Sequence, residues 1–183
     1  MKKRLGLVVL LVSALFMGCS SDTDDKKEDI DEVAAVSATI NGKEWKATKI
    51  KKVVLVQNIP NVGVQLLNLY FNDDSQALSL ICESSLSSND TMPLKEYFYN
   101  DTDTNAWFLN YYLIDGVGYV RHSQKYGKIT ITAMNPEKKT VSGTFSFRAE
   151  KENVYQTEIV APDVFEVTNG VFTNLPYSVI KGK

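Results

Sequence analysis

The chain has 183 residues, of which 44% are hydrophobic and 23% are charged, and this composition excludes a protein that is disordered throughout. The formal net charge is −2, and seven acids with two bases fall between residues 20 and 32, which leaves the body from Val33 onward close to neutral. A neutral body without a basic stripe argues against nucleic acid as a partner.

The first 18 residues are predicted to be a secretion signal. Basic residues at positions 2–4 precede an apolar run over positions 5–17, which is too short to span a bilayer stably. The segment Leu15–Cys19 resembles the lipobox read by lipoprotein signal peptidase, although the two residues before Gly18 depart from the preferred types. We therefore expect cleavage before Cys19 and a lipid on its thiol.

Residues 19–35 are expected to form an acidic, flexible tether. The stretch from Ser20 to Asp25 has no apolar residue, so burial cannot offset the entropy cost of ordering it. Acids directly after the lipidated cysteine resemble the export signal of lipoproteins in Bacteroidota-type bacteria. We expect an outer-membrane lipoprotein displayed on the cell surface, with a periplasm-facing anchor as the alternative.

Residues 36–183 are predicted to fold as one all-β domain. Asn41-Gly42 and Asn169-Gly170 favour type I′ hairpin turns, and Leu94–Tyr99 alone suggests a short helical turn. The expected strands are Ser37–Ile40, Glu44–Thr48, Val53–Gln57, Val64–Phe71, Ala77–Glu83, Trp107–Ile114, Lys128–Met134, Val141–Ala149, Phe165–Thr168, Val171–Asn174 and Tyr177–Ile180. The architecture is an antiparallel β-sandwich or flattened barrel of about eight to ten meandering strands.

The pattern of apolar residues separates two kinds of strand. Lys128–Met134 and Val141–Ala149 alternate between apolar and polar residues, as in a sheet with one wet face. Val64–Phe71 and Trp107–Ile114 are apolar on both faces. The latter two are therefore expected to be covered on both sides or to line a binding space.

Three segments carry a resemblance to a known family. They are Ala38–Ala47 (ATINGKEWKA), Ser142–Phe147 (SGTFSF) and Val167–Phe172 (VTNGVF). They resemble a family of small Bacteroidota lipoproteins of unknown function, over a span from Ser37 to about Tyr177. The resemblance implies the fold and the location, and it assigns no functional residue.

The residues that could support catalysis do not form a credible constellation. The single histidine, His122, excludes a His-rich zinc site, and its neighbour Ser123 points to the opposite face of a strand. With Cys19 lipidated, Cys82 has no disulfide partner and is expected to be buried. We predict that the protein is not an enzyme, has no catalytic residue and needs no cofactor.

Two weaker site hypotheses come from short motifs. The run through Asp101, Asp103 and Asn105 opens like a calcium loop, but Ala106 and the later positions do not continue an EF-hand, so only a looser calcium site is considered. Asp90-Thr91-Met92 resembles the three-residue O-glycosylation site of exported Bacteroidota proteins, which makes Thr91 a candidate for modification.

Aromatic residues suggest the strongest binding hypothesis. Tyr and Trp combine a flat apolar face with a polar tip, which suits both sugar stacking and protein interfaces, although a β core also needs aromatics. The candidate ligand face consists of Tyr97, Tyr99, Trp107, Tyr111 and Tyr112. The predicted function is a non-catalytic binding module for a glycan; the alternatives are an accessory subunit that binds another envelope protein and a lipocalin-like carrier of an apolar ligand.

Overall fold

The computed structural model describes residues 33–57, 63–114, 118–152 and 161–182, and within these ranges it contains eleven strands and no helix. The strands are β1 Ala35–Ile40, β2 Lys43–Lys46, β3 Lys49–Gln57, β4 Val64–Asn72, β5 Gln76–Ser85, β6 Glu96–Tyr99, β7 Ala106–Ile114, β8 Gly118–Asn135, β9 Thr140–Lys151, β10 Val164–Pro176 and β11 Ser178–Lys181. The all-β prediction is confirmed. The predicted signal, Cys19 and most of the tether lie outside the described residues.

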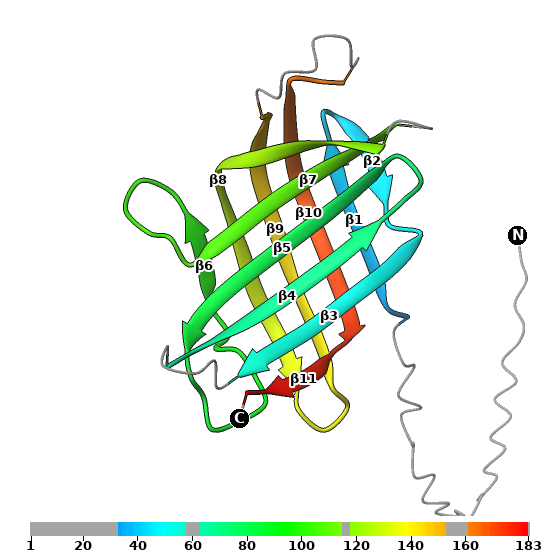
Figure 1. Ribbon diagram of the computed structural model, residues 1–183. Helices are drawn as coiled ribbons and strands as arrows, with labels where there is room; N and C mark the ends of the chain where they lie inside the picture. Colours follow the sequence, from blue (N-terminus) through cyan, green and yellow to red (C-terminus); the bar gives the residue numbers. More distant parts are fainter. Residues whose placement is uncertain (1–32, 58–62, 115–117, 153–160, 183) are drawn as a thin grey trace, which may run out of the picture. The chain divides into compact units, whose positions relative to one another are not determined.

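All eleven strands belong to one open sheet. Its order is β11-β3-β4-β5-β7-β8-β9-β10-β1-β2, and β6 pairs with β8 beside this path. Every pair is antiparallel except β11 with β3, which run parallel. Figure 1 shows the sheet folded over on itself, with β3, β4, β5 and β7 crossing in front of β9, β10 and β1. We call the first four strands the front layer, and β6, β9, β10, β1, β2 and the second half of β8 the back layer.

Aromatic side chains fill the space between the two layers. Phe108 on β7 stacks on Phe147 of β9 with ring centroids 4.9 Å apart. Phe71 on β4 lies 5.8 Å from Phe145 of β9 and 6.1 Å from Trp45 of β2. These contacts join the layers into one continuous hydrophobic core. The inward faces of the doubly apolar strands are therefore occupied by packed side chains.

Strand β8 makes the turn between the layers. Its first half pairs with β7 and its second half with β6, and the register shifts between Gln124 and Tyr126. Gly127 follows this β-bulge directly, and a Cβ atom there would lie 2.6 Å from Cβ of Phe147 and 2.7 Å from the Phe108 ring. Only glycine allows the bent strand to approach the core this closely.

The two Asn-Gly pairs adopt different structures. Asn41 and Gly42 have φ angles of 49° and 78° and connect β1 to β2, so the first predicted hairpin is confirmed. The second predicted hairpin is wrong, because Asn169, with φ 50°, is a bulge inside the continuous strand β10. Pairing of β10 with both β9 and β1 keeps the strand straight across this position. The predicted helical turn at Leu94–Tyr99 is also wrong, since Glu96–Tyr99 forms β6.

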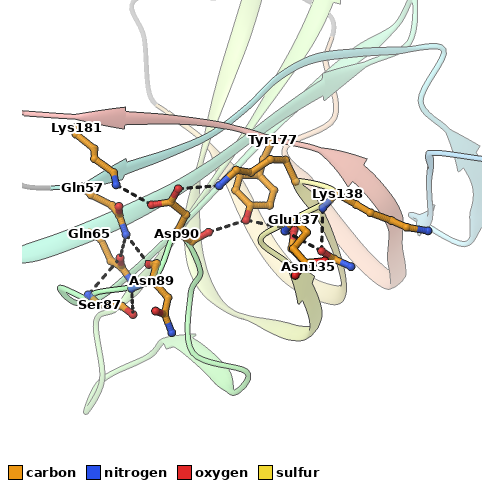
Figure 2. A network of polar contacts seen from close by, with 11 residues as sticks. Gln57, Gln65, Ser87, Asn89, Asp90, Asn135, Glu137, Lys138, Tyr177 and Lys181 are labelled. Atoms are coloured by element: carbon orange, nitrogen blue, oxygen red, sulfur yellow. Dashed lines mark hydrogen bonds and ion pairs between the residues drawn. The ribbon is translucent and has the colours of Figure 1, made fainter.

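A network of polar contacts fixes the connection between β5 and β6. The Gln57 amide donates to Oε1 of Gln65 at 2.8 Å and to the Asn89 carbonyl at 2.9 Å (Figure 2). The Gln65 amide donates to the Thr91 carbonyl at 2.9 Å. Both glutamines are buried, so these bonds also satisfy amide groups that would otherwise be costly to bury.

Asp90 joins this connection to two other parts of the chain. Its carboxylate accepts bonds from Nζ of Lys139 at 2.7 Å and Nζ of Lys181 at 2.9 Å. The Tyr177 hydroxyl donates to the Asp90 carbonyl at 2.6 Å (Figure 2). We call these contacts the Asp90 latch. They join the β5–β6 connection to the turn between β8 and β9, where Lys139 lies, and to β11.

The latch predicts a pH-dependent effect of Asp90→Asn. The bond from Lys139, followed by that from Lys181, lowers the pKa of Asp90 below its ordinary value of 3.8. The latch therefore stabilises the fold above that pH, and this contribution disappears as the pH falls through the folded-state pKa. Urea unfolding should show a lower midpoint for the variant at pH 7 and a shrinking difference from wild type below about pH 4.

The matched control for this prediction is Asp74→Asn. The Asp74 carboxylate is 93% exposed and lies 3.9 Å from Lys49, so its loss should leave the urea midpoint nearly unchanged. An Asp90→Asn effect that is the same at pH 3 and pH 7 would contradict the electrostatic origin of the latch.

Candidate functional site

The five aromatic residues of the predicted ligand face do not form one surface. Tyr97 is fully buried, and its hydroxyl donates to the Pro93 carbonyl at 2.8 Å. Tyr99 and Tyr112 are half-buried and pack against the core, whereas Trp107 and Tyr111 alternate with buried β7 residues and point outward. Strand alternation thus separates neighbours such as Tyr111 and Tyr112.

A groove on the outside of the back layer combines aromatic and polar side chains. Its volume is about 330 Å³. It lies over β8, β9 and β10 at the point where β6 ends. We call it the back groove, and its lining residues are Tyr99, Asn100, Tyr126, Gly127, Lys128, Ser146, Phe147, Glu166, Val167 and Thr168.

The bulge in β8 positions the most exposed aromatic ring of this groove. Tyr126 pairs with Arg148 across the strands, whereas the next residue, Gly127, pairs with the buried Phe147. Tyr126 therefore points outward, and it is 50% exposed. Lys128 follows on the same face opposite Ser146, so an aromatic residue and a cation lie side by side along the groove.

Ion pairs hold the charged side chains around the groove. Nζ of Lys128 contacts Glu96 at 2.6 Å, and Nη1 of Arg148 contacts Glu166 at 3.4 Å. Arg148 also contacts Glu150 at 3.3 Å, and this bond raises the pKa of the guanidinium. Lys125 also contacts Glu150, at 3.2 Å, so three cations pair with three acids. This balance of charge suits a neutral ligand rich in hydroxyl groups better than an ion.

The adjoining loop presents one amide group toward solvent. Oδ1 of Asn100 accepts bonds of 2.8 Å from the backbone N–H groups of Thr102 and Asp103 and from the Thr102 hydroxyl. This Asx turn fixes the Asn100 side chain. Its NH₂ group makes no hydrogen bond within the part of the chain that the structure describes, so it remains available to a ligand.

The calcium hypothesis receives little support from this loop. Asp101 and Asp103 are exposed, and the side-chain oxygen of Asn105 accepts the Phe98 N–H at 2.7 Å. Among the described residues, no three His, Cys, Asp or Glu side chains come together in a group that could hold a metal ion.

His122 and Cys82 are both interior residues. His122 is fully buried, with Nε2 2.7 Å from the Pro162 carbonyl and the ring edge-on to Phe165 at 4.7 Å. Ser123 points the other way and bonds Glu152. Cys82 is a free, buried thiol, as predicted, and burial raises its pKa.

Thr91, the candidate for O-glycosylation, lies within the latched connection. Thr91 is half-buried, while its neighbours Asp90 and Met92 are engaged in the latch and in the core. O-glycosylation of Thr91 therefore stays a prediction. In the folded chain, Thr91 lies in a segment that the contacts of Asp90 and Met92 hold in place.

Of the apolar and aromatic residues on the outside of the front layer, only Trp107 and Tyr111 are among the site candidates named from the sequence. Eight apolar or aromatic side chains point outward there and are half-buried: Val56, Leu66, Tyr70, Ile81, Trp107, Leu109, Tyr111 and Leu113. We call this surface the front outer face. The signal for it was the apolar character of both faces of Val64–Phe71 and Trp107–Ile114.

The fold defines the described part of the chain as an all-β domain built on a single open sheet. Residues 32–176 match a family described as a domain of unknown function (DUF6252), and the chain belongs to that family. The match confirms an uncharacterised domain family over nearly the predicted span. No curated protein and no solved structure matches the chain. No helix among the described residues is long and apolar enough to cross a membrane.

Two alanine substitutions should distinguish core from surface aromatics. Tyr97→Ala should lower the free energy of unfolding by about 3–5 kcal/mol, because it empties a fully buried site and removes the bond to Pro93. Trp107→Ala should cost only about 1 kcal/mol, since its side chain is half-buried on the outer face of the sheet, where Ile81 is its cross-strand partner. Urea unfolding of both variants measures the difference, and equal losses would place Trp107 in the structural core.

Proposed function

We propose that this protein is a non-catalytic binding module, held on the outer membrane by a lipid on Cys19, and that its back groove binds glycans. The observation that carries the glycan assignment is the alternation of aromatic and polar side chains along the groove. The half-exposed Tyr126 ring offers a flat apolar surface to the C–H face of a sugar. Lys128, Asn100 and Thr168 supply hydrogen-bonding groups beside it.

The rigidity of the groove supports the same assignment. Its volume of about 330 Å³ lies at the lower end of the range for small-molecule sites. The Lys128–Glu96 and Arg148–Glu166 pairs hold two of its walls before any ligand arrives. Side chains that are already fixed lose little conformational entropy on binding, which favours recognition of weakly apolar ligands such as sugars.

The membrane anchor is supported by the N-terminal segment, in which basic residues, an apolar run and Gly18-Cys19 follow one another. Within the described residues, the strands and the core lie between residues 34 and 182, and the proposed signal and Cys19 lie outside that domain. The apolar-carrier alternative has less support, because Phe71, Phe108 and Phe147 fill the space between the layers. The absence of catalysis is supported by the position of His122, which is bonded and closed off in the interior.

Removal of the Tyr126 ring tests the glycan assignment. A panel of purified oligosaccharides is titrated calorimetrically against the wild-type chain, and Tyr126→Ala should weaken any observed binding by at least about tenfold. The thermal midpoint should change little because the ring is half-exposed. Tyr119→Ala, which removes a 62% exposed tyrosine on the opposite side, is the control and should bind normally. Failure of every oligosaccharide to bind would reject the glycan assignment.

Cys19→Ala tests the anchor separately. The wild-type protein should fractionate with membranes and carry the added mass of a lipid, because the thioether places acyl chains in the bilayer. The variant should lack that mass and leave the membrane fraction. A wild-type chain that is released as a soluble protein of unmodified mass would contradict the anchor.

A further inference from the structure

We propose that the front outer face is a membrane-docking surface that lays the domain on the anionic surface of the bilayer to which it is anchored. This inference rests on the proposed lipid anchor, and it adds an orientation to it. The face consists of the outward side chains of β3, β4, β5 and β7, and in Figure 1 these strands form a continuous layer facing the viewer.

The composition of the face matches the interfacial zone of a membrane. Aromatic residues with polar tips, namely Tyr70, Trp107 and Tyr111, lie among aliphatic residues such as Leu66 and Leu109. Tyrosine and tryptophan are the side chains that favour the headgroup region, where the ring is apolar and the tip meets water. A bilayer also tolerates the scattered polar positions that a dry protein interface would leave unpaired.

Tyr111 of the face packs against Tyr119 of the neighbouring strand β8. Their rings meet edge to face, with centroids 5.1 Å apart. Burial raises the pKa of Tyr111, while nearby Arg121 lowers it and Tyr119 and Tyr70 raise it. Tyr111 is thus already partly desolvated, which reduces the cost of placing its ring against lipid headgroups.

A second β-bulge adds positive charge to the same face. The β3–β4 register shifts between Ile50 and Lys52, so Ile50 packs against the core while the exposed Lys51 and Lys52 follow it. Lys52 pairs across the strands with Tyr70. Neither lysine has an ion-pair partner in the part of the chain that the structure describes.

This charge is complementary to an anionic bilayer. Glu83 is the one acid at the outward positions of β3, β4, β5 and β7 as the structure describes them. Lysines beside an apolar aromatic face can extend to headgroup phosphates while the rings enter the interface. A second copy of this face would bring the same unpaired lysines together, which disfavours a symmetric dimer through it.

Because the proposed anchor would hold the domain close to the bilayer, weak attraction by the docking face would be sufficient to orient it. Cys19 lies 14 residues before Val33 in the sequence, and the flexible tether predicted from the sequence would average about 20 Å end to end over that length. The lipid therefore keeps the domain at a high local concentration near the bilayer, so that modest attraction sets its orientation. Because the front and back layers pack through their inner faces, docking by the front outer face turns the back groove away from the membrane.

Vesicle binding by the unlipidated chain from Ser20 to Lys183 tests the docking face without the anchor. The chain is sedimented with vesicles of phosphatidylglycerol and phosphatidylethanolamine, and with vesicles of phosphatidylcholine alone. We expect measurable partitioning onto the anionic vesicles only. Lys51→Glu with Lys52→Glu should reduce this partitioning by about tenfold or more. The matched control, Lys43→Glu with Lys46→Glu on β2, makes the same change in net charge away from the face.

The two tryptophans provide an independent readout. Trp45 is buried, and its Nε1 has no hydrogen-bond partner among the residues that the structure describes, so Trp45→Phe should be tolerated and leaves Trp107 as the sole tryptophan. Emission from Trp107 should shift to the blue when anionic vesicles are added. No binding to anionic vesicles, an equal loss in both charge-reversal variants, or an unshifted Trp107 would overturn the inference. Glycan binding and lipidation of Cys19 are measured separately, so those proposals survive if only vesicle docking fails.

Discussion

The bend in β8 is the constraint on which the rest of the structure depends. A single open sheet has two faces to cover, and this one covers its inner face by folding over on itself. The bulge before Tyr126 and the missing side chain at Gly127 allow β8 to pass from one layer to the other. Phe108 and Phe147 then stack across the layers directly at the bend.

That same bend separates the two outer surfaces. Many outward positions of the front layer are aromatic or aliphatic, whereas the outward positions of β8 and β9 beyond the bulge are mostly polar. The back groove and the front outer face therefore lie on opposite sides of one domain. The function that we propose, a lipid-anchored binding module, would use such a division, with one side toward the bilayer and the other accessible to ligand.

The buried and latched polar contacts hold the connections between strands in place. Asp90 ties three segments that are far apart in the sequence, and the buried Gln57 and Gln65 satisfy each other and the adjoining backbone. Asn110 is different, because it is buried with both side-chain amide atoms unpaired in the part of the chain that the structure describes. We have no physical account of that residue.

The sequence by itself determined the all-β class, the first Asn-Gly hairpin, the alternation along Val141–Ala149 and the burial of Cys82. These features depend on local backbone preference and on the period-two pattern of a strand. Only the tertiary structure decided that Asn169 is a bulge, that Tyr97 is core while Trp107 is surface, and that Lys51 and Lys52 join an aromatic face. Those outcomes depend on register between strands distant in sequence, where a shift of one residue exchanges the two faces of the sheet.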